Sequence, residues 1–251
     1  MPDHSPATPA LAAAQLEARP GRLAESIEAH LLFATLAADA GARLVIFPEL
    51  SLTSYDTTLT LRDAIDPDHP ALRPLGELAR RRGIVVVAGA PLASERRLLI
   101  GSVIFRPDAP VTTYTKRYIH HSETPPFAAG EGGALLPVGG TRVGLAICAE
   151  VNHPAHVVDT VASGAEVYAA SCFLSPGGYD RDFRRLTTYA GTHRMPVLMS
   201  NFADSAALES AGGTAAWDDT GRLLAAAPRT GECVVVALRE DDGWVGRIIE
   251  R

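Results

Sequence analysis

The sequence predicts an α/β domain whose sheets are mixed rather than purely parallel. Short, fully apolar segments of strand length alternate along the chain with segments of helical periodicity. These strands lack polar alternation, which is typical of sheets covered on both faces. A candidate hairpin and a late succession of short strands indicate antiparallel neighbours within the same sheets. Since the chain has 251 residues and no linker, we expect residues 1–251 to form one domain.

The first half of the chain predicts five strands and two helices. Apolar side chains at helical spacing, followed directly by Gly41, predict a helix over 23–40. A second helix over 70–82 ends at Gly83 for the same reason. The strands are expected at 9–15, at 44–47, at 84–88 and, on either side of a turn at 107–110, at two positions between 98 and 115.

The second half repeats this alternation of strands and helices. A proline near the first position favours a helix at 154–162, and helical periodicity predicts another at 181–194. Strands are expected at 143–147, 166–171 and 195–201, followed by short strands near 213–217, 222–226 and 232–238.

The composition excludes several classes of protein. Hydrophobic residues make up 47% and charged residues 21% of the chain, which excludes a disordered protein. The 23 basic and 29 acidic residues give a net charge of −6, which argues against a nucleic-acid-binding face. No apolar segment reaches the roughly 18 residues of a membrane span. The apolar stretch from Pro9 to Ala14 is too short for a signal peptide. Three scattered cysteines form no disulfide framework, so we expect a cytoplasmic protein.

Lys116 is the only lysine of the chain, and the other 22 basic residues are arginine. Arginine is bulkier and forked, and it keeps its proton, so it cannot replace a compact ammonium group. In a composition so strongly biased toward arginine, the single lysine indicates a position that requires an amine. The alternative is that the single lysine stands at position 116 by chance.

Three polar residues stand where apolar strands end, which is where α/β proteins tend to hold their active sites. They are Glu49, Lys116 and Cys148. A cysteine at a strand-to-helix turn can project its sulfur beside backbone N–H groups. Each residue also has an ordinary interpretation, as an exposed charge or a small buried side chain. Cys172 and Cys233 adjoin apolar segments and are expected to be such buried side chains.

Four short motifs follow one another along the chain around these residues. They are Phe47-Pro48-Glu49 with Tyr55 after it, Tyr114-Thr115-Lys116, Glu123 followed by Phe127 and Gly130, and Gly144 four residues before Cys148. A strand–turn–strand pattern from Gly212 to Gly221 comes later. In type and order these motifs resemble the nitrilase superfamily of carbon–nitrogen hydrolases, and the resemblance extends from about residue 9 to residue 237.

The resemblance implies a four-layer α-β-β-α sandwich with two mixed sheets. It also implies a homodimer or a higher homo-oligomer and a reaction that needs no cofactor. His120-His121 and the pair formed by His153 and His156 lack the other ligands of a metal motif, so we expect no metal site.

The residue types indicate how such a site works. An amide carbonyl is a poor electrophile, so hydrolysis needs a thiolate nucleophile at Cys148 and a stabilised oxyanion. Glu49 is expected to act as the general base, with a pKa raised by burial. Lys116 is expected to favour the thiolate and to lie beside the oxyanion. The resemblance implies the backbone N–H of Ala149 as the second oxyanion donor and Glu123 as the partner that holds Lys116.

The substrate pocket is predicted less directly. Tyr55, His120 and Phe173 are expected on its walls, Phe173 because the segment 172–179 follows a strand near the site. The chain departs from the family at Ala149, where an aromatic residue is common, although Glu150 keeps the acid that often follows. The small side chain is expected to reshape the pocket beside the cysteine.

The sequence therefore predicts a thiol hydrolase that cleaves the C–N bond of a small amide or N-carbamoyl compound through an acyl-enzyme at Cys148. A nitrilase would use the same three residues, and acyl transfer to an amine is another possible reaction. A non-catalytic binding protein on the same fold is the alternative from another class. A cysteine hydrolase with a Cys/His pair would need a nearby histidine, for which His120 is the candidate.

Overall fold

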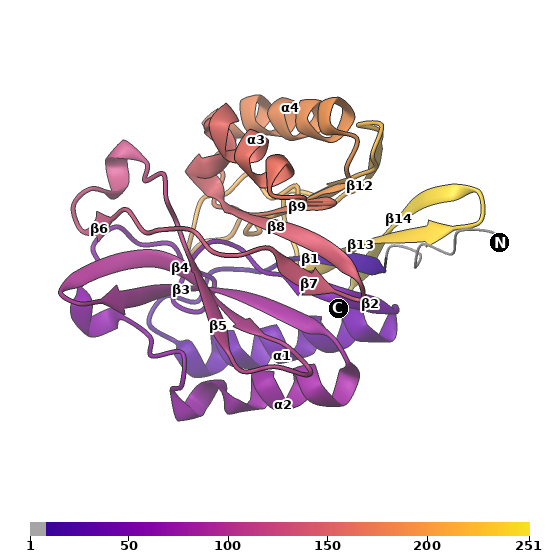
Figure 1. The fold of residues 1–251 in the computed structure, drawn as a ribbon. Helices are drawn as coiled ribbons and strands as arrows, with labels where there is room; N and C mark the ends of the chain where they lie inside the picture. Colours follow the sequence, from indigo (N-terminus) through magenta and orange to yellow (C-terminus); the bar gives the residue numbers. More distant parts are fainter. Residues whose placement is uncertain (1–8) are drawn as a thin grey trace.

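The computed structural model describes residues 9–251 and consists of four layers (Figure 1). Two β-sheets pack face to face, and a pair of helices covers the outer face of each sheet. This arrangement confirms the predicted α-β-β-α sandwich and its mixed sheets. The domain predicted over 1–251 includes residues 1–8, which lie outside the described residues.

The first sheet has eight strands in the order β14-β13-β1-β2-β3-β4-β5, with β6 beside β4. The central strands β1, β2 and β3 are parallel, and the other neighbours are antiparallel except for β6. The strands are β1 (Ala10–Gln15), β2 (Ala42–Ile46), β3 (Val85–Ser94), β4 (Arg97–Phe105), β5 (Thr112–Thr115), β6 (Phe127–Ala128), β13 (Cys233–Glu240) and β14 (Gly243–Glu250).

The second sheet has six strands in the order β12-β11-β10-β9-β8-β7. Its parallel centre consists of β8, β9 and β10, with antiparallel strands on both sides. The strands are β7 (Leu136–Val138), β8 (Thr141–Ile147), β9 (Val167–Ser171), β10 (Val197–Ser200), β11 (Ala215–Trp217) and β12 (Leu223–Ala226).

Four α-helices form the outer layers. The first sheet is covered by α1 (Leu23–Asp39) and α2 (Arg73–Arg82), and the second by α3 (Pro154–Ala162) and α4 (Pro176–His193) (Figure 1). Gly83 ends α2 in a left-handed conformation with φ of 62°, which a glycine adopts without the strain of a Cβ. None of the helices within residues 9–251 is both long and apolar enough to cross a membrane.

Three apolar layers hold the sandwich together. The middle layer lies between the sheets and includes Leu44, Ile46 and Leu145. Alternate residues of the same strands point outward, so Val45 packs toward α1 and α2. The outer layer of the second sheet contains Tyr168 and packs against α3 and α4. Because the central strands are buried on both faces, they are apolar throughout, as their sequences indicated.

Most predicted elements are present, and the differences have local causes. Helix α4 begins at Pro176 rather than 181, because a proline is compatible with the first turn of a helix even when glycines follow. Strand β3 continues to Ser94 through Pro91, where it has lost its β2 neighbour and pairs only with β4. Strands β6, β7 and β14 were not predicted. Strands β13 and β14 form a hairpin around Asp241 and Asp242, and Asp242-Gly243 is the hairpin signal in the sequence.

Candidate active site

Glu49, Lys116 and Cys148 meet between the two sheets. Glu49 follows β2, Lys116 directly follows β5, and Cys148 directly follows β8 of the second sheet. The Lys116 Nζ donates to Glu49 Oε1 at 2.6 Å. It also donates to both carboxylate oxygens of Glu123, at 2.8 and 2.9 Å. The predicted partner of Lys116 is therefore in contact with it.

The three charged side chains of this cluster are almost completely removed from solvent, with exposed fractions of 0% for Lys116 and Glu49 and 1% for Glu123. Burial lowers the pKa of the Lys116 ammonium, but the surrounding carboxylates and thiol outweigh this effect and hold the pKa above its usual range. The lysine therefore stays charged at neutral pH. With both carboxylates ionised, the cluster carries one net negative charge.

Glu49 keeps one oxygen free within this cluster. Its Oε2 is buried and has no hydrogen-bond partner among the described residues. Burial and the neighbouring Cys148 raise the pKa of Glu49 well above its usual range, against the opposing effect of Lys116. A buried carboxylate oxygen without a donor is well suited to accept a proton, which agrees with the raised pKa expected for this residue.

Cys148 occupies a strained turn. It begins a short 3-10 helix, Cys148–Asn152, and its backbone φ is 43°, in the left-handed region that non-glycine residues rarely adopt. Such strain is frequent at active sites, where it directs a side chain toward the substrate. Cys148 is partly exposed as a residue, and its sulfur lies 3.2 Å from the carbonyl oxygen of Phe173. The turn therefore presents the thiol at the end of the strand.

The Cys148 thiol is not a thiolate at rest. The neighbouring Cys172 and burial both raise the pKa of Cys148 well above its usual range, although Lys116 opposes this shift. Cys172 is buried, as predicted. Its position next to Cys148 was not predicted. A thiolate therefore forms only if the proton finds an acceptor close by.

A cavity of about 330 Å³ opens onto the sulfur of Cys148. Tyr55 and Phe173 lie on its wall with their rings stacked 4.3 Å apart, and His120 also lines it. Tyr55 donates a hydrogen bond from its hydroxyl to Glu123 at 3.2 Å, so the wall contacts the charged cluster. Ala149 lines the cavity as well, next to the sulfur. All the predicted pocket residues are thus at this cavity.

The cavity also has polar lining residues that the sequence analysis did not single out. Arg181 and Asp182, from α4, form a two-point ion pair at 2.8 and 3.2 Å, and Asn152 lies beside them. The predicted start of this helix at 181 was five residues late, so its first turns were not assigned to the site. No signal in the sequence separated Arg181 from the other arginines.

Glu150 connects the two segments that carry Lys116 and Cys148. One of its carboxylate oxygens accepts the backbone N–H of Arg117 at 2.7 Å, and the other accepts that of Ile147 at 2.8 Å. The Tyr114 hydroxyl donates to the second oxygen at 2.7 Å. Each of these donors is within two residues of Lys116 or Cys148. The carboxylate therefore joins the end of β5 to the end of β8.

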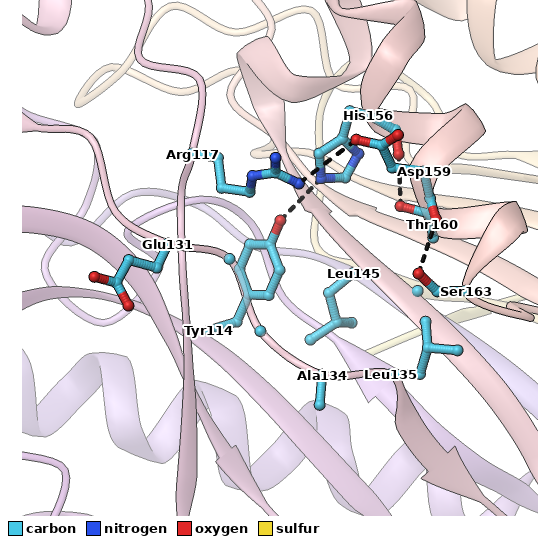
Figure 2. A pocket seen from close by; sticks show the side chains of 13 residues that line it. Tyr114, Arg117, Glu131, Ala134, Leu135, Leu145, His156, Asp159, Thr160 and Ser163 are labelled. Atoms are coloured by element: carbon cyan, nitrogen blue, oxygen red, sulfur yellow. Dashed lines mark hydrogen bonds and ion pairs between the residues drawn. The ribbon is translucent and has the colours of Figure 1, made fainter.

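A second cavity of about 360 Å³ lies behind this connection (Figure 2). Figure 2 shows Tyr114 and His156 in contact at its wall, where their polar atoms are 3.0 Å apart. Burial lowers the pKa of His156 to about 4, so the imidazole is neutral at pH 7. Cys148 does not line this cavity, whereas it does line the first one. The thiol is therefore accessible from the first cavity.

The histidine pairs contact aromatic rings in the structure. The rings of His120 and His121 are tilted against each other with centroids 4.1 Å apart, and His153 stacks on Tyr118 at 4.2 Å. Across residues 9–251, no three side chains of the metal-binding types come together as a ligand set.

Comparison with known proteins agrees with this site. The family model described as carbon–nitrogen hydrolase matches residues 10–242. The chain belongs to the carbon–nitrogen hydrolase family. This finding confirms the nitrilase-superfamily resemblance and identifies the protein as a carbon–nitrogen hydrolase. The matched range contains every residue of the site described above.

Individual relatives of this carbon–nitrogen hydrolase are distant. An (R)-stereoselective amidase of Pseudomonas sp. is 28% identical over 230 residues, which cover 86% of this chain and 79% of the relative. A Mycobacterium tuberculosis protein named only as a hydrolase is 31% identical over 156 residues, which cover 58% of this chain and 55% of the relative. The chain thus spans about half the length of that second relative.

Two solved structures confirm the fold. The NitN amidase from Nesterenkonia sp. AN1 superposes with a TM-score of 0.82 at 22% identity, covering 93% of each chain. Nit3 of Saccharomyces cerevisiae, a member of the nitrilase superfamily, gives a TM-score of 0.83 at 19% identity and covers 93% of this chain and 90% of its own. Similarity at this level of identity concerns the sandwich architecture alone.

Proposed function

We propose that this carbon–nitrogen hydrolase cleaves the C–N bond of a small amide or N-carbamoyl compound through an acyl-enzyme at Cys148. The observation that carries the proposal is the free, buried Oε2 of Glu49 in a cluster that also holds Lys116. Related proteins support the amide class. The Pseudomonas relative is named an amidase, and the Nesterenkonia amidase has been described with an acetamide moiety covalently added at its active-site cysteine.

The first step is the transfer of the Cys148 proton to Glu49. Ionising the thiol to bulk water would add a second net negative charge to a desolvated cluster, which is costly. Transfer to Glu49 leaves the net charge unchanged. The thiolate then attacks the carbonyl carbon of the substrate, and the oxyanion is stabilised by the Lys116 ammonium and the backbone N–H of Ala149. Each such donor contributes about 3–4 kcal/mol to lowering the barrier.

The second half of the reaction uses the same proton acceptor. Glu49 returns its proton to the departing nitrogen, the C–N bond breaks, and ammonia or an amine leaves. A water molecule then binds where the amine was and gives a proton to Glu49 as it attacks the thioester carbon. The C–S bond breaks, the carboxylic acid leaves, and Glu49 returns the proton to the Cys148 sulfur. Glu123 holds Lys116 in position throughout, through its two hydrogen bonds to Nζ.

The cavity limits the size of the substrate. About 330 Å³ is at the lower end of the volumes of small-molecule sites, which favours a compact amide. The stacked rings of Tyr55 and Phe173 provide an apolar wall for the acyl group. A nitrile is the alternative substrate, because the same residues would form a thioimidate with it. Acyl transfer to an amine would divert the same acyl-enzyme.

Several further properties belong to this proposal. We expect a homodimer or higher homo-oligomer, a cytoplasmic protein and a single catalytic domain over 1–251 that acts without a cofactor. The net charge of −6 supports a protein that does not bind nucleic acid, and three unpaired cysteines support a reducing compartment.

The test is the rate of alkylation of each cysteine between pH 5 and pH 9, measured by peptide mass spectrometry (roughly the range in which thiols titrate). We expect Cys148 to react much faster than Cys172 and Cys233 near neutral pH, since only Cys148 has a proton acceptor and an open cavity. The rate at Cys148 is expected to fall in Glu49→Gln and in Lys116→Met. This measurement requires no prior choice of substrate.

A screen for ammonia release from amides, carbamoyl compounds and nitriles follows from that result. Activity on amides or carbamoyl compounds supports the proposal. Activity confined to nitriles would mean that the substrate is a nitrile and not an amide or a carbamoyl compound. Equal and slow alkylation of all three thiols in the folded protein would contradict the assembled triad. The non-catalytic binding protein would then be the better interpretation.

A further inference from the structure

We propose that Cys172 is a resolving thiol for the nucleophile, so that oxidation of Cys148 by a peroxide ends in a reversible Cys148–Cys172 disulfide within the active site. The disulfide does not depend on the proposed function. The loss of activity that it would cause does depend on it, because Cys148 must then be the nucleophile.

The strand register places the two cysteines at neighbouring positions. Strands β8 and β9 are parallel, and their last aligned pair is Ile147 with Ser171. Cys148 and Cys172 directly follow these two residues, at the point where both strands end. Neighbouring strands lie about 4.8 Å apart, and the two Cα atoms of a disulfide are usually about 4.4–6.8 Å apart. The backbone spacing therefore allows the bond without separating the strands.

The side chains also lie on the same side of the second sheet. Cys172 belongs to the apolar layer between this sheet and its helices, and Cys148 packs against that layer. The Cys148 sulfur also contacts the carbonyl oxygen of Phe173, the residue directly after Cys172, at 3.2 Å. The peptide that carries Cys172 is held on both sides, since its N–H donates to Ser200 at 2.8 Å and its carbonyl accepts from Glu49 at 3.3 Å. The second thiol is thus held close to the first.

The two sulfurs differ in access to solvent. Cys148 is partly exposed and lines the cavity of about 330 Å³, which a peroxide can enter. Cys172 is buried, with an exposed fraction of 1%. Peroxide therefore reaches Cys148 first, and Cys172 is available only to a sulfur that is already inside the site. This is the arrangement expected of an attacked thiol and its resolving partner.

The oxidation proceeds in two balanced steps. The Cys148 thiolate attacks one oxygen of hydrogen peroxide, the O–O bond breaks, and hydroxide leaves; the sulfur is oxidised to a sulfenic acid while peroxide is reduced. The proton that Cys148 gave to Glu49 converts the hydroxide into water. The Cys172 sulfur then attacks the sulfenic sulfur, the S–O bond breaks, and the hydroxide leaves as water with the proton of Cys172.

A reductant also reaches the disulfide through the cavity, at the Cys148 sulfur. A small dithiol entering the cavity attacks the Cys148 sulfur, the S–S bond breaks, and Cys172 leaves as a thiol. The second thiol group of the same reductant then releases Cys148 and becomes oxidised to a cyclic disulfide. Without a resolving thiol, the sulfenic acid can react with more peroxide and become sulfinic acid, which such reductants do not reverse.

The experiment treats the full-length protein with hydrogen peroxide, blocks free thiols, digests without reductant and determines peptide masses. We expect a cross-linked peptide that contains Cys148 and Cys172. We also expect alkylation of Cys148 to fall about tenfold or more and to recover after dithiothreitol. In Cys172→Ser and Cys172→Ala, sulfinic acid is expected at Cys148, without recovery.

Cys233→Ser is the matched control, because Cys233 is also buried but lies on β13 of the other sheet. It should form the same cross-link as the unmodified chain. Sulfinic acid at Cys148 in the unmodified chain, with no cross-linked peptide, would overturn the proposal. The proposal would also be overturned if alkylation of Cys148 after dithiothreitol recovered as completely in Cys172→Ser as in the unmodified chain. A cross-link without any hydrolytic activity would leave the disulfide in place and count only against the proposed function.

Discussion

The two sheets contribute different chemistry to one cavity. The segments that follow strands of the first sheet carry charge, with Glu49 after β2 and both Lys116 and Glu123 after β5. Those that follow strands of the second sheet carry the sulfur of Cys148 and the ring of Phe173. Neither sheet alone holds a nucleophile together with its proton acceptor. The site therefore exists only where the sheets pack on each other.

Two contacts across the sheets keep these halves in register. The backbone N–H of Glu49 donates to the carbonyl of Cys172 at 3.3 Å. Glu150 of the second sheet accepts the N–H of Arg117 and the hydroxyl of Tyr114, which both belong to the segment around Lys116. The charged half and the sulfur half are thus joined close to the reacting atoms. Substitutions in each half, and in the contact between them, should have different consequences.

The largest effect on activity is expected from removing the sulfur of Cys148. Cys148→Ala should lower kcat by about 10⁴-fold or more, because no other group can form the acyl-enzyme. The charged cluster contains no atom of this side chain, so the thermal midpoint should change little. Hydrolysis assays and thermal unfolding of Cys148→Ala, with Cys233→Ala as the buried-cysteine control, test both points. Full activity in Cys148→Ala would mean that the sulfur is not the nucleophile.

Removing the charge of Lys116 should affect both activity and stability. Lys116→Met should lower kcat by roughly 10²–10³-fold through loss of an oxyanion donor. It should also destabilise the fold by about 3–5 kcal/mol, because Glu49 and Glu123 are left as buried carboxylates without a cation. Unfolding in denaturant at pH 5 and at pH 8 measures this cost. Since the carboxylates can protonate at the lower pH, the destabilisation should be smaller there.

Lys116→Arg is the matched variant that keeps the charge. The guanidinium is larger and forked, and Lys116 is completely enclosed, so the variant should also lose activity. An arginine variant with activity near that of the unmodified chain would show that any cation suffices. The single lysine of the sequence would then be a matter of chance.

The contact between the halves should have an intermediate effect. Glu150→Gln exchanges one acceptor oxygen for an NH₂ group, so one of the donors held by Glu150 loses its partner in a buried site. Leaving such a donor without a partner costs about 1–3 kcal/mol. If this cost falls on the transition state, kcat decreases by roughly 10–100-fold. Measured kcat and KM should show the loss mainly in kcat, since the cavity wall is unchanged.

Glu166→Gln is the control for this variant. Glu166 also accepts a backbone N–H, that of Arg142 at 2.9 Å, but it is about half exposed and far from the cluster in the chain. Its substitution should change neither kcat nor stability by more than the small amount typical of surface sites. Equal effects of Glu150→Gln and Glu166→Gln would contradict a positioning role for Glu150.

The sequence predicted the ends of the strands better than the contacts between them. Glu49, Lys116 and Cys148 could be assigned because each follows an apolar segment whose end is visible in the chain. The partners Cys172 and Glu150 could not be assigned, because their contacts depend on strand register and on the packing of the sheets. Arg181 could not be assigned either, because nothing in the sequence separates it from the other arginines and its place at the cavity depends on how α4 packs.

The pH dependence sharpens the role of the charged half. Burial raises the pKa of Glu49 above the ordinary glutamate value of 4.5, and the negative charge of Glu123 contributes to this shift. The acid limb of kcat/KM should therefore lie above pH 4.5, with activity lost as the pH falls and Glu49 becomes protonated. Glu123→Gln removes a negative neighbour, which lowers the pKa of Glu49 and should move this limb to lower pH. A limb that stays in place would mean that Glu49 does not control it.

The smallest effect is expected at His120, which decides between this triad and a Cys/His pair. His120 lines the cavity, but its Nδ1 contacts the hydroxyl of Ser122 at 2.7 Å. The backbone N–H of His120 donates to Glu123 at 2.8 Å, and this bond survives in His120→Ala. We therefore expect kcat to change by less than about threefold, as for an ordinary surface substitution. If the imidazole were the base, its removal would cost about as much as the loss of Cys148, because nucleophile and base act as one unit. Comparing kcat of His120→Ala with that of Glu49→Gln therefore identifies the group that accepts the thiol proton.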